Sequence, residues 1–181
     1  MKGPVRPEDN PGEQARPYLF AEPDAPVYAV LDGASVEGLL QRLNDYQPAA
    51  ECLYRGELAP DIAEVAPYLV QLDPKSAFCD WVLNAGWGKH WGIFAVSRAD
   101  LRTMRRHFRN FLTVHDSEGK PLLFRYYDPR VLRVYLPTCN AKELEAIFGP
   151  VLCYIVEDEE PGELLRFQVT NGELAMNCKK L

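Results

Sequence analysis

Short apolar runs alternate with segments of helical spacing between residues 26 and 156. Val27 to Leu31 forms a continuous apolar run closed by Asp32 and Gly33, which predicts a strand buried on both faces and then a turn. Further strands are predicted at 51–54, 66–72, 91–96 and 151–156, with a hairpin at 111–115 and 121–127. Strands alternating with helices predict an α/β fold, a single compact domain with a mixed β-sheet flanked by helices.

Helix boundaries are predicted from capping residues. Ser97 and Asp100 have the spacing of a capping box, and so do Asn140 and Glu143. Gly149 and Pro150 form a stop signal for the second of these helices. The predicted helices cover 36–43 with Ser35 as the cap, 76–84, 97–110, the segment that begins at Pro129, and 140–148.

The two ends of the chain have a different composition from its middle. Residues 1–25 contain five of the fifteen prolines and little periodic apolar pattern, which predicts a flexible N-terminal arm. Residues 26–156 are predicted to form the α/β domain. Residues 157–181 begin with the acidic run 157–160 and are predicted to form an acidic C-terminal extension, with an edge strand around 164–169.

Composition and charge narrow the function classes. The chain has 181 residues, 47% of them hydrophobic, which is enough for a core. Its net charge of −6 argues against nucleic acid as a partner, because a phosphate-backbone binder needs a broad basic surface. No apolar run is long enough to span a bilayer, and no signal-peptide core precedes the domain, so membrane insertion is not expected and a cytoplasmic location is.

Catalytic and metal-binding patterns are not found in the sequence. The five cysteines are an odd set without a CxxC pair or a nearby histidine cluster, so neither a disulfide framework nor a metal site is predicted. The three histidines have no spacing that indicates a Cys–His hydrolase, and no nucleotide-binding or hydrolase motif is present. We therefore expect no catalytic residues and no cofactor.

The most informative segment runs from Phe124 to Leu132. Asp128 is predicted to cap a helix through its carboxylate, and Pro129 then occupies the first helical position, where its missing N–H costs nothing. Arg125 and Arg130 are not needed for this turn. Each is expected either to pair with a carboxylate inside the fold or to contact a partner, with Tyr127 as a further partner-binding candidate.

Two other groups of residues are candidates for partner binding. Trp87 and Trp91 are predicted either to line an exposed groove or to pack in the core. A stripe of arginines on the 97–110 helix would attract an acidic segment, although it could equally be a solvated face or meet the chain's own acidic run. These arginines are Arg102, Arg105, Arg106 and Arg109.

Four motifs occur in an order that resembles a known family. They are Tyr28 to Ala34, Ala66 to Val70, Gly86 to Gly88 and Phe124 to Leu132, of which the last is the most specific. The chain resembles, over residues 27–156, the effector-adaptor chaperones of bacterial type VI secretion, long catalogued as a domain of unknown function. Members commonly have a longer C-terminal lobe than residues 157–181 could supply, so this chain looks like a minimal version.

The resemblance implies a function without catalysis. It implies a cytoplasmic protein of a Gram-negative bacterium that binds a toxic effector, often by the effector's N-terminal segment, and helps to load it onto the VgrG spike protein. The alternative is an enzyme that uses Arg125, Arg130 and the helix arginines to hold a small phosphorylated ligand. The turn from Asp32 to Ser35 could also cradle an anion, although a turn followed by a helix cap explains the same residues.

Overall fold

A seven-stranded sheet forms the centre of the computed structural model, which describes residues 10–160 and 162–181. Every strand pairing in it is antiparallel. In spatial order the strands are β2 (Ala50–Cys52), β3 (Pro67–Leu72), β1 (Val27–Asp32), β4 (Gly92–Ser97), β7 (Val151–Glu157), β8 (Glu163–Thr170) and β9 (Glu173–Lys180).

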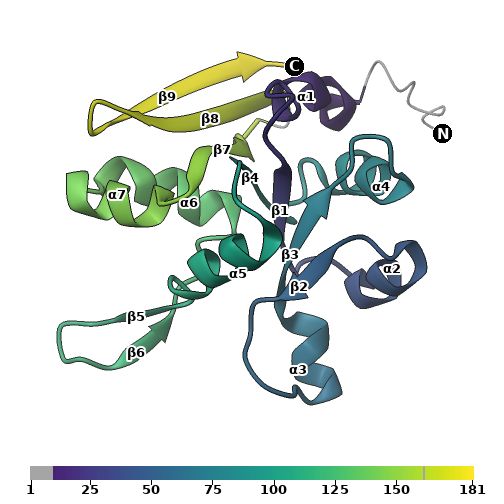
Figure 1. Ribbon diagram of the computed structural model, residues 1–181, viewed down its shortest axis with the longest axis horizontal. Coiled ribbons are helices and arrows are strands. Elements are labelled where there is room, and N and C mark those ends of the chain that lie inside the picture. Colours follow the sequence, from purple (N-terminus) through teal and green to yellow (C-terminus); the bar gives the residue numbers. More distant parts are fainter. Residues whose placement is uncertain (1–9, 161) are drawn as a thin grey trace.

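Helices cover both faces of the sheet (Figure 1). One face packs against α1 (Pro11–Leu19), α2 (Leu39–Tyr46) and α4 (Ala77–Gly86), and the other against α5 (Leu101–Arg109), α6 (Pro129–Tyr135) and α7 (Ala141–Phe148). Successive residues of β1 alternate between the two cores, with Ala29 in the first and Val30 in the second. This double burial explains the continuous apolar run of β1. The predicted α/β fold of a sheet flanked by helices is confirmed, with an antiparallel sheet in place of the predicted mixed one.

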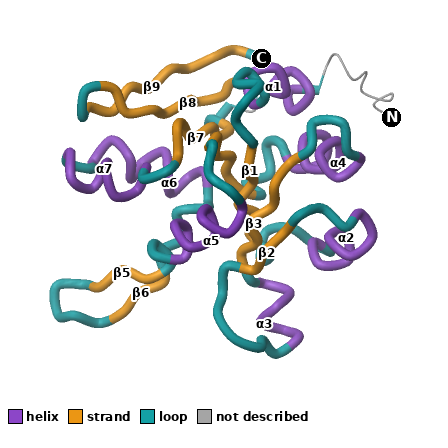
Figure 2. Tube along the Cα trace, viewed as in Figure 1, coloured by secondary structure: helices purple, strands orange, loops and turns teal. Residues whose placement is uncertain are grey.

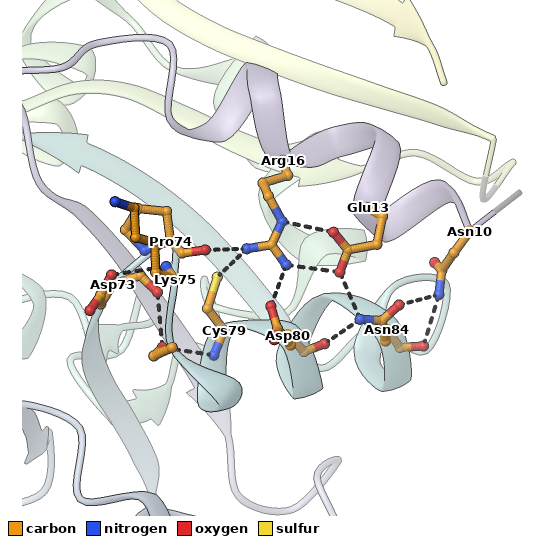
Figure 3. A network of polar contacts seen from close by, with 10 residues as sticks. Asn10, Glu13, Arg16, Asp73, Pro74, Lys75, Cys79, Asp80 and Asn84 are labelled. Carbon is orange, nitrogen blue, oxygen red and sulfur yellow. Dashed lines mark hydrogen bonds and ion pairs between the residues drawn. The ribbon is translucent and has the colours of Figure 1, made fainter. Parts of the chain in front are cut away.

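The N-terminal segment contains a docked helix. Ala15 and Leu19 of α1 are fully buried, and a Cβ on Gly12 would lie 2.0 Å from the carbonyl oxygen of Leu83 in α4. Arg16 donates to Glu13 and to Asp80, which ties α1 to α4 (Figure 3). The prediction of a flexible arm over residues 1–25 is wrong for residues 11–19, and residues 1–9 lie outside the described part of the chain.

Two helices begin later than predicted, because neither Ser35 nor Ser97 lies at the start of its helix. The Ser35 hydroxyl donates to Asp32, and α2 starts only after Gly38, whose φ is +71°. Ser97 is the last residue of β4; its hydroxyl donates to the Pro150 carbonyl and accepts the N–H of Ala99, while Asp100 caps α5. The capping box of Asn140 and Glu143 at the start of α7 is confirmed.

The last residues of the chain continue the sheet. The strand predicted at 164–169 is present as β8, but it is not an edge strand. A further strand that the sequence analysis did not predict, β9, pairs with its other side. Asn171 and Gly172 have φ values of +54° and +80° and form the tight turn between them. Residues 163–180 are therefore part of the same sheet as β7.

Two small elements extend away from the sheet (Figure 2). The predicted hairpin is present as β5 (Thr113–His115) and β6 (Pro121–Leu123), a separate two-stranded sheet with shorter strands than expected. The short helix α3 (Pro60–Val65) was not predicted, and a 3-10 turn (Leu136–Thr138) follows α6.

A candidate protein-binding site at one end of the sheet

The strands bring several polar residues to one end of the sheet. Asp32 is the last residue of β1, Glu157 is the last residue of β7, and Gly92 is the first residue of the antiparallel strand β4. The backbone N–H of Asp32 donates to the Trp91 carbonyl at 2.8 Å, which places Trp91 at the same end. Ionisable and aromatic side chains from distant parts of the sequence therefore meet here.

Asp32 is a buried carboxylate held by three donors. Its oxygens accept hydrogen bonds from the Ala34 N–H at 3.2 Å and the Ser35 hydroxyl at 2.7 Å, and they form an ion pair with Arg125. The Asp32 side chain is 2% exposed, whereas that of Arg125 is 41% exposed. The carboxylate thus fixes the position of a guanidinium that still faces solvent.

Asp128 repeats this arrangement at the start of α6. Its Oδ1 accepts from the backbone N–H of Arg130 at 3.0 Å and from Arg130 Nε at 2.9 Å, and its Oδ2 accepts from Nη2 at 2.7 Å. Burial opposes ionisation of Asp128, but the hydrogen bonds and the charge of Arg130 outweigh it and hold the Asp128 pKa below its ordinary value. The predicted cap and the Pro129 at the first helical position are confirmed.

Glu157 is the third buried carboxylate at this end. It accepts backbone hydrogen bonds from Gly88 and from His90, the latter at 2.7 Å. The His90 Nδ1 lies 2.5 Å from Glu157 Oε1 without the geometry of a hydrogen bond. Arg133 of α6 donates to the Glu157 backbone carbonyl at 2.9 Å, so α6 is joined to the end of β7.

These residues form one group, which we call the acid–arginine cluster: Asp32, Arg125, Asp128, Arg130, Arg133 and Glu157. Arg130 links its parts electrostatically. Its pKa is raised mainly by the hydrogen bond and charge of Asp128, and further by the charges of Asp32 and Glu157. Burial opposes the charged form of Arg125, but the hydrogen bond and charge of Asp32, together with the charge of Asp128, raise the Arg125 pKa above its ordinary value.

The two predicted tryptophans lie next to this cluster. Trp87 stacks on Phe94 with a centroid distance of 6.1 Å, and Trp91 packs against Trp81 at 4.8 Å. Both are partly exposed and line one small cavity together with Glu157. Both rings pack against the core, as one of the two predictions had it, and a role in partner binding stays a prediction.

The predicted arginine stripe on α5 divides into two pairs. Arg105 pairs with Glu51 at 3.0 Å, and Arg109 donates to the backbone carbonyls of Leu53 and Tyr54 at 2.9 and 2.6 Å. These two side chains hold the segment that follows β2. Arg102 and Arg106 are exposed and remain available as partner contacts.

Tyr127, a further candidate, is a core residue. It is 1% exposed, and burial, followed by the nearby Tyr54 and Asp32, raises its pKa above the ordinary value. The proposal that Tyr127 contacts a partner directly is therefore corrected. Gly33 has the structural role expected of it, since a Cβ there would lie 2.4 Å from the Glu64 carbonyl oxygen.

Three members of this site were not identified from the sequence: His90, Arg133 and Glu157. Glu157 directly follows the apolar run 151–156, and Arg133 lies one helical turn after Arg130, so both had a weak positional signal. His90 had no such signal in the sequence, because the feature that distinguishes it, a positive φ of 59°, is visible only in the structure.

One group of side chains has atoms close enough together to hold a metal ion, but its charges are already balanced by the protein. In the described part of the chain, ligand atoms of Asp158, Glu163 and Cys178 lie within 4.8 Å of one another. Lys180 and Arg133 already lie 3.8 and 3.9 Å from the two carboxylates, so positive charge is supplied by the protein itself.

Comparison with known proteins identifies a family. The family model described as "Domain of unknown function (DUF4123)" matches residues 27–146, more than half of the 181-residue chain. The match extends from β1 to α7 and includes Asp32, Arg125 and Arg130. No curated protein and no solved structure matches the chain. None of the described helices has the length and apolar character needed to cross a membrane. The chain belongs to the DUF4123 family of domains of unknown function.

Proposed function

We propose that this protein is a non-enzymatic adaptor that binds a secreted effector of a type VI secretion system and helps to load it onto the VgrG spike. The single observation that carries the proposal is the geometry of Arg125 and Arg130. Both side chains are about half exposed, at 41% and 54%, and each guanidinium group is held by a buried carboxylate. Arginines fixed in this way lose little side-chain entropy when a partner binds.

The surroundings of these arginines suit a protein partner. Arginine and tryptophan are the residues most enriched at binding hot spots, and Trp87 and Trp91 lie at the same end of the sheet. The guanidinium donors that face solvent can bind carboxylates or backbone carbonyls of a peptide. An effector segment with acidic residues beside an apolar anchor is the ligand class that this surface fits.

The same geometry supports a role without catalysis. A general acid or base needs a pKa close to the working pH, whereas the pKa of Asp128 is held low by Arg130. A nucleophilic cysteine needs a lowered pKa, whereas burial raises those of Cys79 and Cys153. These groups are therefore better suited to structure than to reaction.

Affinity capture from the native cytoplasm, read by mass spectrometry, tests the proposal. The wild-type chain is expected to recover one toxin-like protein or a VgrG protein, and Arg130→Glu to recover much less. Arg98→Glu is the matched control, because Arg98 is exposed and follows Ser97 at the opposite end of β4. Equal recovery by the two variants would contradict the assignment of the site, and recovery of neither partner by the wild type would contradict the function.

A second candidate is an enzyme that binds a phosphorylated ligand, which two guanidinium groups in one cluster would favour. The carboxylates of Asp32 and Asp128 work against it, since they would repel a phosphate. A thermal-shift panel of nucleotides and sugar phosphates separates the two functions. A ligand at a hundred times its dissociation constant stabilises the folded protein by about 2.7 kcal/mol. Unchanged melting curves across the panel would therefore exclude the ligand-binding enzyme.

A further inference from the structure

The outer edge of β9 is open along its whole length. β9 spans Glu173–Lys180 and pairs with β8 on one side, and in the described part of the chain no strand pairs with its other side. Figure 1 shows it along the margin of the molecule. An exposed edge strand of eight residues presents free N–H and C=O groups and is a template for pairing with another strand.

The orientation of these free groups follows from the pairing of β9 with β8. Leu181 donates its N–H to the Gly162 carbonyl at 2.8 Å, so residue 181 belongs to a hydrogen-bonded pair of the antiparallel ladder. Such pairs recur at every second residue. The backbone groups of the odd-numbered residues of β9 therefore bond to β8. The backbone N–H and C=O groups of the even-numbered residues point away from β8; these residues are Leu174, Met176, Cys178 and Lys180.

The side chains of the outward-bonding residues are largely apolar. Leu174, Met176 and Cys178 lie opposite Val169, Phe167 and Leu165 of β8 and so share one face of the sheet with them. Met176 is 57% exposed and Cys178 is exposed, in contrast to the buried Phe167. This edge thus carries an apolar row that its own fold leaves uncovered.

We propose that β9 pairs in antiparallel fashion with β9 of a second copy of this chain, in a register centred on Met176. In this register Leu174 lies opposite Cys178 of the second copy, and Met176 lies opposite its own equivalent. Glu173 lies opposite Lys179 of the second copy. A two-fold dimer of this kind makes the same contact twice, so it gains two Glu–Lys pairs.

Charge selects this register over its neighbours. Backbone N–H and C=O groups that point outward must lie opposite outward-pointing groups of the second copy, so even-numbered residues pair with even-numbered ones. This excludes any register that places Glu173 opposite Lys180. Centring the pairing on Ala175 or Asn177 satisfies the ladder but places Glu173 opposite Asn177 or Leu181. Among the described residues neither Glu173 nor Lys179 forms an ion pair within the chain, so both charges are free for the second copy.

Sedimentation equilibrium of the full chain tests the dimer. The expected mass is twice the 20.5 kDa of one chain, falling toward the monomer on dilution. Glu173→Lys and Lys179→Glu are each expected to weaken the dimer about tenfold, because like charges then face each other twice. The double variant restores opposite charges and should restore the affinity, while Arg98→Glu, which makes the same change of charge as Lys179→Glu at an exposed residue outside β9, should leave it unchanged.

Cross-linking tests the register independently. Opposed residues in a hydrogen-bonded antiparallel pair have Cα atoms about 5.5 Å apart, a distance that a disulfide bridges. Met176→Cys in a Cys178→Ser background should therefore form a covalent dimer on mild oxidation, whereas Cys178 in the wild-type chain should not. A monomer at all concentrations, a dimer indifferent to both single charge reversals, or no rescue by the double variant would overturn the proposal.

Discussion

The carboxylate of Asp128 caps α6 and at the same time fixes the guanidinium of Arg130, through contacts of 2.7 to 3.0 Å. One buried side chain thus connects a structural task with a surface task. Stability should depend mainly on Asp128, which is buried, and partner binding mainly on Arg130, which is 54% exposed. Substitution at the two positions separates the tasks.

Asp128→Ala is expected to lower the free energy of unfolding by about 1–2 kcal/mol, because it removes the cap of α6. Arg130→Gln should cost less than about 1 kcal/mol, since an exposed ion pair contributes little and Asp128 keeps the backbone N–H of Arg130. Urea unfolding measures both. Equal losses for the two variants would show that the ion pair, and not the cap, carries the stability.

Arg125→Gln is expected to lower the free energy of unfolding by about 1–2 kcal/mol, more than Arg130→Gln. Asp32 is almost fully buried, and without Arg125 its charge keeps only the Ser35 hydroxyl and the Ala34 N–H. Arg125→Lys should recover part of the loss. Arg102→Gln, an exposed arginine on α5, is the control and should leave the urea midpoint nearly unchanged.

Local signals predicted much of this fold. The run of β1 and the caps at Asp128 and Asn140 are decided by a few neighbouring residues, and all three were predicted correctly. Ser35 and Ser97 were predicted as caps and are not, because both helices start further along the chain: α2 follows Gly38, whose φ is +71°, and α5 follows Asp100, whose carboxylate accepts the Thr103 N–H. Which of several nearby residues becomes the cap is not visible in the spacing of residues.

The site was harder to predict than the fold, because long-range contacts build it. Arg125 and Asp32 are 93 positions apart in the sequence, so their pairing depends on the strand order. The helix α1 was missed for a related reason. Its prolines suggested an arm, whereas Pro11 occupies the first helical turn and the buried Leu19 is stabilised by contacts with the core.

The docking of α1 on α4 can be tested through Gly12. Gly12→Ala is expected to release α1, because its Cβ would lie 2.0 Å from a backbone atom of α4 that has little room to move. Limited proteolysis should then cleave residues 10–25 faster than in the wild type. Tyr18→Ala, at an exposed position of the same helix, is the control, and cleavage at the wild-type rate in Gly12→Ala would contradict this close contact.

His107 provides a prediction for the pH dependence of stability. Its ring packs against Phe108 and Phe111, and its Nε2 lies 2.9 Å from the Ile147 carbonyl oxygen. Burial lowers its pKa below the ordinary value of 6.5, and the hydrogen bond to the carbonyl only partly opposes this. Between the lowered pKa and 6.5 the unfolded chain binds a proton that the folded chain does not, so stability falls as the pH falls through this window.

His107→Gln should remove this dependence. The glutamine amide can still donate to the Ile147 carbonyl but cannot become charged. We expect the wild type to lose up to about 1.4 kcal/mol for each pH unit below 6.5 until the folded pKa is reached, and the variant to lose clearly less over the same range. Melting temperatures from pH 7.5 downward measure the difference. Parallel curves for the two proteins would show that His107 protonates equally in the folded and unfolded states, contrary to its burial against α7.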